Sequence, residues 1–113
     1  MPFVFTKLPN DLIYVVLKSG KAVDFTNFYF KYISNQEMGL RWQVVFSLKI
    51  DKRACVRNKN KRIVKECVRM ALVNARTNKN LDLLIVIKKR IDLLDFKTIK
   101  TEIGQGINKL NYL

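Results

Sequence analysis

Residues 52–69 read KRACVRNKNKRIVKECVR, and this stretch has the clearest helical period in the chain. At about 100° per residue, its apolar side chains gather on one side; these are Val56, Ile63, Cys67, Met70 and Ala71. Polar and basic residues gather on the other side, namely Arg57, Asn58, Lys61, Arg62, Lys65 and Arg69. Glu66 is the one acid inside the run, so the charges repel rather than pair. The pattern predicts a helix that packs with one face and offers the other to a polyanion, although a merely solvated face is the usual alternative.

The whole chain has the charge balance of a protein with an anionic partner. Its 113 residues include 22 Lys and Arg against 9 Asp and Glu, a formal charge of +13. This length fits one domain, and such a charge destabilises a compact monomer unless a polyanion or a membrane surface neutralises it. No apolar run approaches the roughly 18 residues of a membrane span, and no signal peptide is recognisable. We therefore expect a cytoplasmic protein that binds nucleic acid.

The two cysteines fit neither a disulfide nor a metal site. Cys55 and Cys67 lie twelve residues apart in the predicted helix, about 18 Å at 1.5 Å per residue, and a disulfide allows only about 7 Å between Cα atoms. The chain has no histidine, so a zinc site lacks ligands. Both thiols are expected to be free.

Taken in order, the periodicities predict an α+β domain. A short helix should follow the start signal at 9–11 and end at Gly20. A strand of period two is predicted at 23–33, a second strand at about 41–49, the basic helix from 52 into the 69–75 region, a buried strand at 81–87 and a last helix near 95–110. The order is αββαβα, a single domain in which helices pack on a mixed sheet of four-stranded type and the basic helix is the crossover.

The first predicted strand has one aromatic side and one mixed side. Phe28, Phe30 and Tyr32 should face the core. The mixed side carries Asn27, Tyr29 and Lys31, residue types that stack on bases and meet phosphates. Solvent exposure explains this mixed side equally well.

In this arrangement the residues resemble the protein subunit of bacterial ribonuclease P. That family has a Lys-rich strand end followed by a helix of the pattern Arg-Asn-Arg-x-Lys-Arg, and this chain has Lys49, Lys52, Arg53, then 57–62 and Glu66. The similarity also includes 18–21, Arg41, 82–89 and 93–95, and it covers about Asn10 to Leu110. The chain departs from the family pattern at a few positions, which are Lys59 for arginine, Asn60 for an aliphatic residue, Ile13 and Leu17 for phenylalanines, and Lys31 for an aromatic residue.

The resemblance implies a ribonucleoprotein endonuclease that removes 5′ leaders from precursor tRNA, with magnesium ions held mainly by the RNA subunit. The protein would be a non-catalytic subunit that needs no protein partner, and its fold would be ribosomal-protein-like with a left-handed strand–helix–strand crossover. The implied contacts to the RNA subunit are Lys49, Lys52, Arg53, Arg57, Asn58, Lys59, Lys61, Arg62, Lys65 and Arg69. The implied contacts to the leader are Ile13, Leu17, Asn27, Tyr29 and Lys31.

The residues independently favour a non-catalytic role without a protein-bound metal. The acids are scattered, and the closest pair, Asp92 and Asp95, precedes a predicted helix where capping explains it. A nuclease that acts without RNA would need clustered carboxylates. Two alternatives remain: a small ribosomal or other structural RNA-binding protein, which shares the charge and size, and a membrane-surface binder, which would expose the apolar helix face that the sheet requires.

Overall fold

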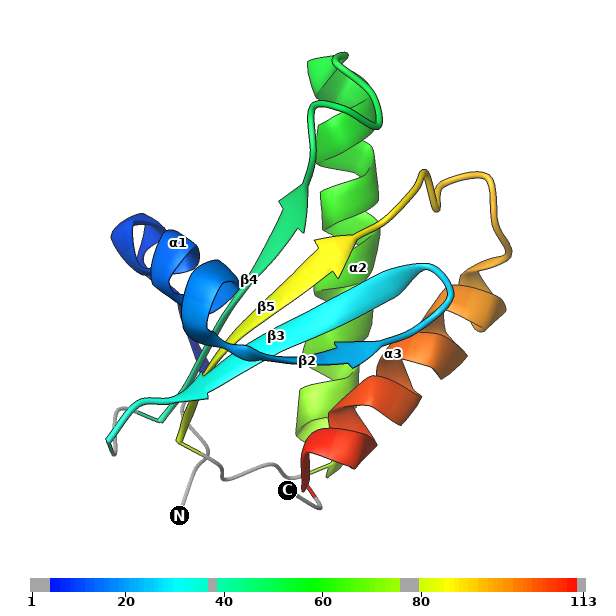
Figure 1. The fold of residues 1–113 in the computed structure, drawn as a ribbon. Coiled ribbons are helices and arrows are strands. Elements are labelled where there is room, and N and C mark those ends of the chain that lie inside the picture. Colours follow the sequence, from blue (N-terminus) through cyan, green and yellow to red (C-terminus); the bar gives the residue numbers. More distant parts are fainter. Residues whose placement is uncertain (1–4, 37–38, 76–79, 112–113) are drawn as a thin grey trace.

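One mixed sheet with helices on both of its faces makes up the fold (Figure 1). The computed structural model describes residues 5–36, 39–75 and 80–111. Its elements are β1 (Phe5–Lys7), α1 (Asn10–Ser19), β2 (Lys21–Asp24), β3 (Phe28–Ser34), β4 (Leu40–Phe46), α2 (Ala54–Ala75), β5 (Leu81–Ile87) and α3 (Phe96–Asn111). The predicted α+β class is confirmed.

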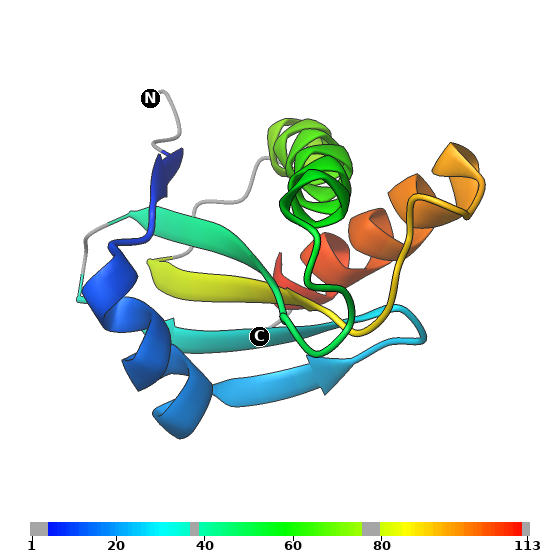
Figure 2. The same ribbon diagram turned by 90° about the horizontal axis from the view of Figure 1, so that it is seen from above.

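The strand order places the basic helix between two parallel neighbours. The sheet has five strands in the order β1-β4-β5-β3-β2. β4 and β5 are parallel and α2 connects them, whereas β3 is antiparallel to β5 and to β2. The connection through α2 is left-handed, as Figures 1 and 2 show together. This is the rare hand for such a crossover, and it agrees with the fold that the resemblance implied.

The sheet has two short edge strands, β1 and β2, that the predicted order of elements did not contain as separate strands. The single strand predicted at 23–33 is divided by the turn 25–27, in which Phe25 N donates to Phe28 O at 2.9 Å, into β2 and β3. β1, of three residues, pairs with β4 and was not predicted. Three residues are too few to show a period of two, so only the tertiary pairing reveals this strand.

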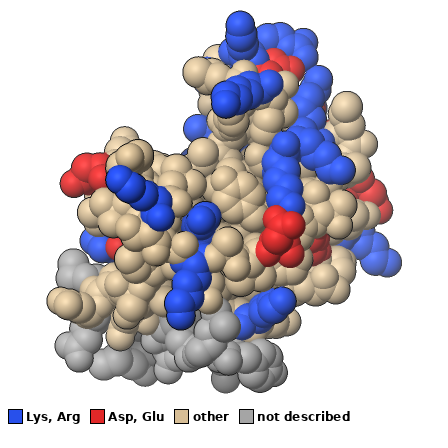
Figure 3. All heavy atoms as spheres, in the orientation of Figure 1, with Lys and Arg blue, Asp and Glu red and all other residues tan. Residues whose placement is uncertain are grey.

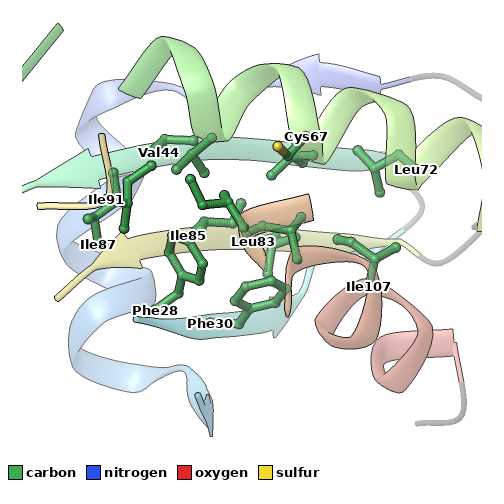
Figure 4. Packing of buried hydrophobic residues seen from close by; sticks show 14 of the residues in the cluster. Phe28, Phe30, Val44, Cys67, Leu72, Leu83, Ile85, Ile87, Ile91 and Ile107 are labelled. Atoms are coloured by element: carbon green, nitrogen blue, oxygen red, sulfur yellow. The ribbon is translucent and has the colours of Figure 1, made fainter. Parts of the chain in front are cut away.

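The sheet separates two apolar clusters. The larger lies against α2 and α3 and includes Phe28, Phe30, Leu83 and Ile107 (Figure 4). The smaller lies against α1, on the opposite face of the sheet (Figure 2), around Val16. Residues of β5 contribute alternately to both clusters, which explains why this strand reads as a continuous apolar run. α2 and α1 are therefore fixed on opposite faces, and each predicted binding surface lies on its own side of the sheet.

Candidate nucleic-acid interface

α2 carries the main concentration of positive charge. In Figure 3, Lys and Arg spheres gather over its N-terminal half, with few acidic spheres among them. The helix begins at Ala54, two residues later than predicted, after a turn in which Asp51 Oδ1 accepts a hydrogen bond of 2.9 Å from Arg53 N. Lys49 and Lys52 lie in this connection, and both are exposed.

The buried face of α2 is rotated relative to the predicted one. Residues buried on this helix are Val56, Asn60, Val64, Cys67, Val68 and Leu72. Met70, which was predicted to pack, is only half-buried. The helix packs against both β4 and α3, so a broad arc of its surface is buried. The centre of this buried arc is displaced from the apolar stripe that the sequence predicts.

This rotation divides the predicted basic face in two. Asn58, Arg62 and Lys65 are exposed, whereas Arg57 and Lys61 are half-buried on the flank of the helix that turns inward. Lys59 is exposed on the side opposite Arg57, because two residues turn the helix by about 200°. Lys59, which the resemblance implied as an RNA contact, therefore lies apart from the predicted basic face.

The inward flank holds positive charge without acidic partners. Among the described residues, Arg57 Nε is buried and has no hydrogen-bond partner. Burial lowers the pKa of the Lys61 ammonium, and three neighbouring cations lower it further; these cations are Lys65, Arg57 and Lys7. Lys7 belongs to β1, a strand that was not predicted, so its position near α2 follows only from the fold. An anion placed here would relieve both the repulsion and the unpaired donor.

The outer flank forms a shallow depression of mixed character. It is lined by Asn58, Lys61, Arg62, Lys65, Glu66 and Arg69. Arg69 Nη1 lies 2.9 Å from Glu66 Oε2, and both side chains are more than half exposed, so solvent weakens this ion pair. The guanidinium groups of Arg62 and Arg69 and the Lys65 ammonium can reach a phosphate backbone that follows the helix.

The arginine before the helix differs from those within it. Arg53 donates from Nε and Nη2 to the two oxygens of Asp51, at 3.1 and 2.9 Å. These bonds hold the pKa of Asp51 well below its usual range. The charge of Arg53, which was predicted to contact RNA, is thus already matched by a carboxylate.

A second polar cluster on the connection after β5 was missed. Arg90 donates to Asp92 from Nε and Nη2 at 3.1 and 2.8 Å, and Arg90 and Asn60 hold the pKa of Asp92 at about 2. Asp92 was assigned to helix capping from its place in the sequence, but its carboxylate binds Arg90 and the Asn60 amide. Only the fold brings these residues to α2, since thirty-two positions separate Asn60 from Asp92.

The predicted leader surface lies on the other face of the sheet. Ile13 and Leu17 of α1 and Tyr29 of β3 are half-buried around the smaller apolar cluster, and Lys31 points to the same face. The expected position of Asn27 is wrong. Its backbone N and its Nδ2 donate to the Glu102 carboxylate of α3, at 2.8 and 2.6 Å, and it is only 6% exposed. Asn27 precedes β3, where the alternation of the strand no longer applies.

Two further properties of the described ranges bear on the chemistry. No group of three or more His, Cys, Asp or Glu side chains in 5–36, 39–75 and 80–111 is arranged to hold a metal ion. No helix of the same ranges is both long and apolar enough to cross a membrane.

Comparison with known proteins gives consistent matches. The family model described as Ribonuclease P matches residues 9–111. The solved ribonuclease P protein of Thermotoga maritima is 22% identical, with 91% of this chain and 96% of that chain covered and a TM-score of 0.78. The corresponding Staphylococcus aureus protein is 16% identical, with 95% and 94% covered and a TM-score of 0.72. No curated protein matches the chain.

Proposed function

Because the chain belongs to the ribonuclease P family, as a protein subunit of this ribonucleoprotein endoribonuclease, we propose that α2 binds the RNA subunit of the enzyme. The observation that carries this proposal is the inward flank of α2, where Arg57 and Lys61 lie together with no acidic partner among the described residues. Counterion release from phosphates would supply most of the affinity. The alternative of a ribosomal protein has no comparable support, because the family match covers almost the whole chain.

The face of the sheet beside α1 is the surface we propose for the 5′ leader of precursor tRNA. Tyr29 offers an aromatic ring, Lys31 a charge, and Ile13 and Leu17 an apolar wall. Single-stranded RNA binds such surfaces by stacking and by phosphate contact. Since α2 lies on the opposite side of the sheet, the protein would contact two different RNA segments at once.

The described residues offer no cluster of donor groups for magnesium. No group of three or more His, Cys, Asp or Glu side chains among them is arranged to hold a metal ion, and the carboxylates of Asp51 and Asp92 are each bound to an arginine. We therefore assign the magnesium ions of the reaction to the RNA subunit, and the protein itself takes no catalytic step. The proposal includes a cytoplasmic location and precursor tRNA as the substrate.

Reconstitution tests the proposal directly. The purified full chain is combined with a bacterial ribonuclease P RNA and a precursor tRNA at a low magnesium concentration that does not support cleavage by the RNA alone. Restored release of the 5′ leader is the expected result. A chain that neither binds the RNA nor restores cleavage would contradict the proposal, and a small basic ribosomal protein of similar charge is the control for non-specific screening.

A further inference from the structure

Asn60 is a fully buried polar residue in the middle of the basic run. It is 0% exposed. Its Nδ2 donates to Val56 O at 2.7 Å and to Asp92 Oδ1 at 3.1 Å. Its Oδ1 accepts from Ile91 N at 2.7 Å and from Asp92 N at 3.0 Å. Both ends of the amide are therefore satisfied, and an aliphatic residue here would leave two backbone N–H groups without this acceptor.

These bonds continue into an ion-pair chain that joins three segments. Beyond Asp92, Arg90 is held by two bonds, and its Nη1 lies 3.9 Å from Asp51 Oδ2, which in turn holds Arg53. We name this set the polar bracket; its members are Asp51, Arg53, Asn60, Arg90 and Asp92. Two arginines are matched by two carboxylates, so the bracket has no net charge. It connects the segment before α2, the segment after β5 and α2 itself.

The bracket lies toward the N-terminal end of α2. Figure 1 shows the N-terminal turns of α2 rising beyond the ends of β4 and β5. Arg57 precedes Asn60 by three positions, about 300° around the helix, and Lys61 follows it directly. The two cations without acidic partners therefore lie within about 100° of Asn60, both on the same side of it. The hydrogen bonds of Asn60 add to the apolar contacts of Val56 and Val64 in fastening this part of the helix.

We propose that Asn60 is a positioning residue, which fixes the N-terminal half of α2 through the polar bracket so that Arg57 and Lys61 meet the phosphates of the RNA subunit. This inference rests on the proposed function. It assigns the bracket no contact with RNA: the paired charges of Arg90 and Asp92 hold the helix, and the unpaired charges beside Asn60 bind.

A double-mutant cycle on the full chain tests this inference. Binding to a bacterial ribonuclease P RNA is measured across a salt series for each variant. In the otherwise unchanged chain, Arg57→Ala should reduce the salt slope by about 0.7 to 0.9, the contribution of one phosphate contact. In the Asn60→Leu background the same substitution should change the slope by much less, because Arg57 is no longer held in place.

Arg69→Ala is the matched control. It removes the same side chain from the same helix, nine residues and about 14 Å from Asn60, where independent effects are expected. Its effect on the slope should be equal in both backgrounds. Circular dichroism establishes that each variant is folded. If Asn60→Leu does not fold, Asp92→Ala replaces it in the cycle, since this change cuts the bracket and leaves the bonds of Asn60 to the backbone.

The outcomes separate the two proposals. A coupling between Asn60 and Arg57 that is absent for Arg69 supports the positioning role. Equal effects of Arg57→Ala in both backgrounds, in a chain that binds the RNA, would overturn this inference alone. A wild-type chain that does not bind the RNA would overturn the proposed function and this inference with it.

Discussion

Arg53 and Arg57 carry the same side chain one helical turn apart, yet their charges are not equally free. Arg53 is 63% exposed and is bound bidentately by Asp51. Arg57 is half-buried, and its Nε has no partner among the described residues. A guanidinium already matched by a carboxylate gains less from a phosphate than one that is unmatched. Burial and ion pairing, rather than the residue type, therefore decide which of the two arginines gains more from binding a phosphate.

This ranking predicts unequal effects of alanine at the two positions. Arg57→Ala should lower the salt slope of RNA binding by about 0.7 to 0.9, and Arg53→Ala should lower it by less, because Asp51 is released at the same time. Filter binding at four or more salt concentrations measures both slopes. Equal losses, or a larger loss for Arg53, would show that the pairing with Asp51 does not persist in the complex.

Lys61 should favour RNA binding but lower the stability of the free chain. Its pKa is lowered in the folded chain, so between this pKa and the unfolded value the unfolded state binds more protons and stability rises with pH. Lys61→Gln removes two like-charge contacts, with Arg57 and Lys65, worth about 0.2 to 0.5 kcal/mol each. Urea unfolding at pH 7 should show a small gain in stability, while RNA affinity falls. A loss of stability would contradict this prediction, because it would mean that the Lys61 ammonium makes a stabilising hydrogen bond in the folded chain.

The sequence predicted the helix α2 and the direction of its side chains, but not their tertiary contacts. A period of 3.6 gives the direction of each side chain from the helix axis. It contains no information on the loop that carries Asp92, nor on Lys7 of β1. Asn60 was recognised as a departure from an aliphatic pattern, but its burial depends on backbone amides thirty-one and thirty-two positions later. Such contacts follow from topology, which a local period does not determine.

At the scale of elements, the two glycines of α3 have different roles. A Cβ on Gly106 would lie 2.6 Å from the ring atoms of Phe30, whereas a Cβ on Gly104 would meet nothing within 4 Å. Phe30 is completely buried, so its ring cannot move aside. Gly106 therefore permits the close approach of α3 to β3, and Gly104 only lowers the intrinsic stability of the helix.

The pair gives a matched prediction of opposite sign. Gly106→Ala should destabilise the chain by about 1 to 3 kcal/mol through overpacking. Gly104→Ala should stabilise it by about 0.5 to 1 kcal/mol through helix propensity. Thermal and urea unfolding of both variants measure the difference. Equal effects of the same sign would mean that α3 does not pack on β3 as described.

The proposed leader surface between α1 and β3 predicts a selective effect on precursor tRNA binding. Tyr29→Ala should weaken precursor tRNA by about 1 to 3 kcal/mol if a leader base stacks on the ring, and mature tRNA should be unaffected. Tyr29→Phe retains the ring and is the control, because it preserves both stacking and packing in the apolar cluster. Equal losses for precursor and mature tRNA would assign this face to another role.

Element boundaries were predictable wherever a period or a stop residue marks them. α1, β5 and α3 lie within about one residue of their predicted ranges, because a glycine stop, a continuous apolar run and an amphipathic pattern mark them. The division of 23–33 into β2 and β3 was not predicted, since the residues on both sides of the turn have strand character. The handedness of the connection through α2 came from the family resemblance, because periodicity carries no information on hand.

At the scale of the whole molecule, the sheet separates the two proposed RNA-binding surfaces, on α2 and beside α1, and the chain as a whole is strongly positive. The formal charge is +13, and among the described residues five of the six ion pairs involve Asp51, Asp82, Asp92 or Asp24. Three of these carboxylates, Asp51, Asp82 and Asp92, are mostly covered and paired with arginines, so they offset little of the positive charge at the surface. Such a chain is suited to screening the repulsion between two RNAs brought close together.

The last prediction concerns this screening. If the chain assists cleavage mainly by electrostatics, added protein should lower the magnesium concentration that the RNA needs, and this benefit should shrink as magnesium or salt rises, since both compete for the same phosphates. Single-turnover cleavage of precursor tRNA is measured across a magnesium series with RNA alone, with protein alone and with both. Cleavage by the protein alone would contradict the non-catalytic role, because no step of the reaction has been assigned to its side chains. A benefit that stays constant from low to high magnesium would instead show that specific leader contacts, such as those expected at Tyr29, outweigh the net charge.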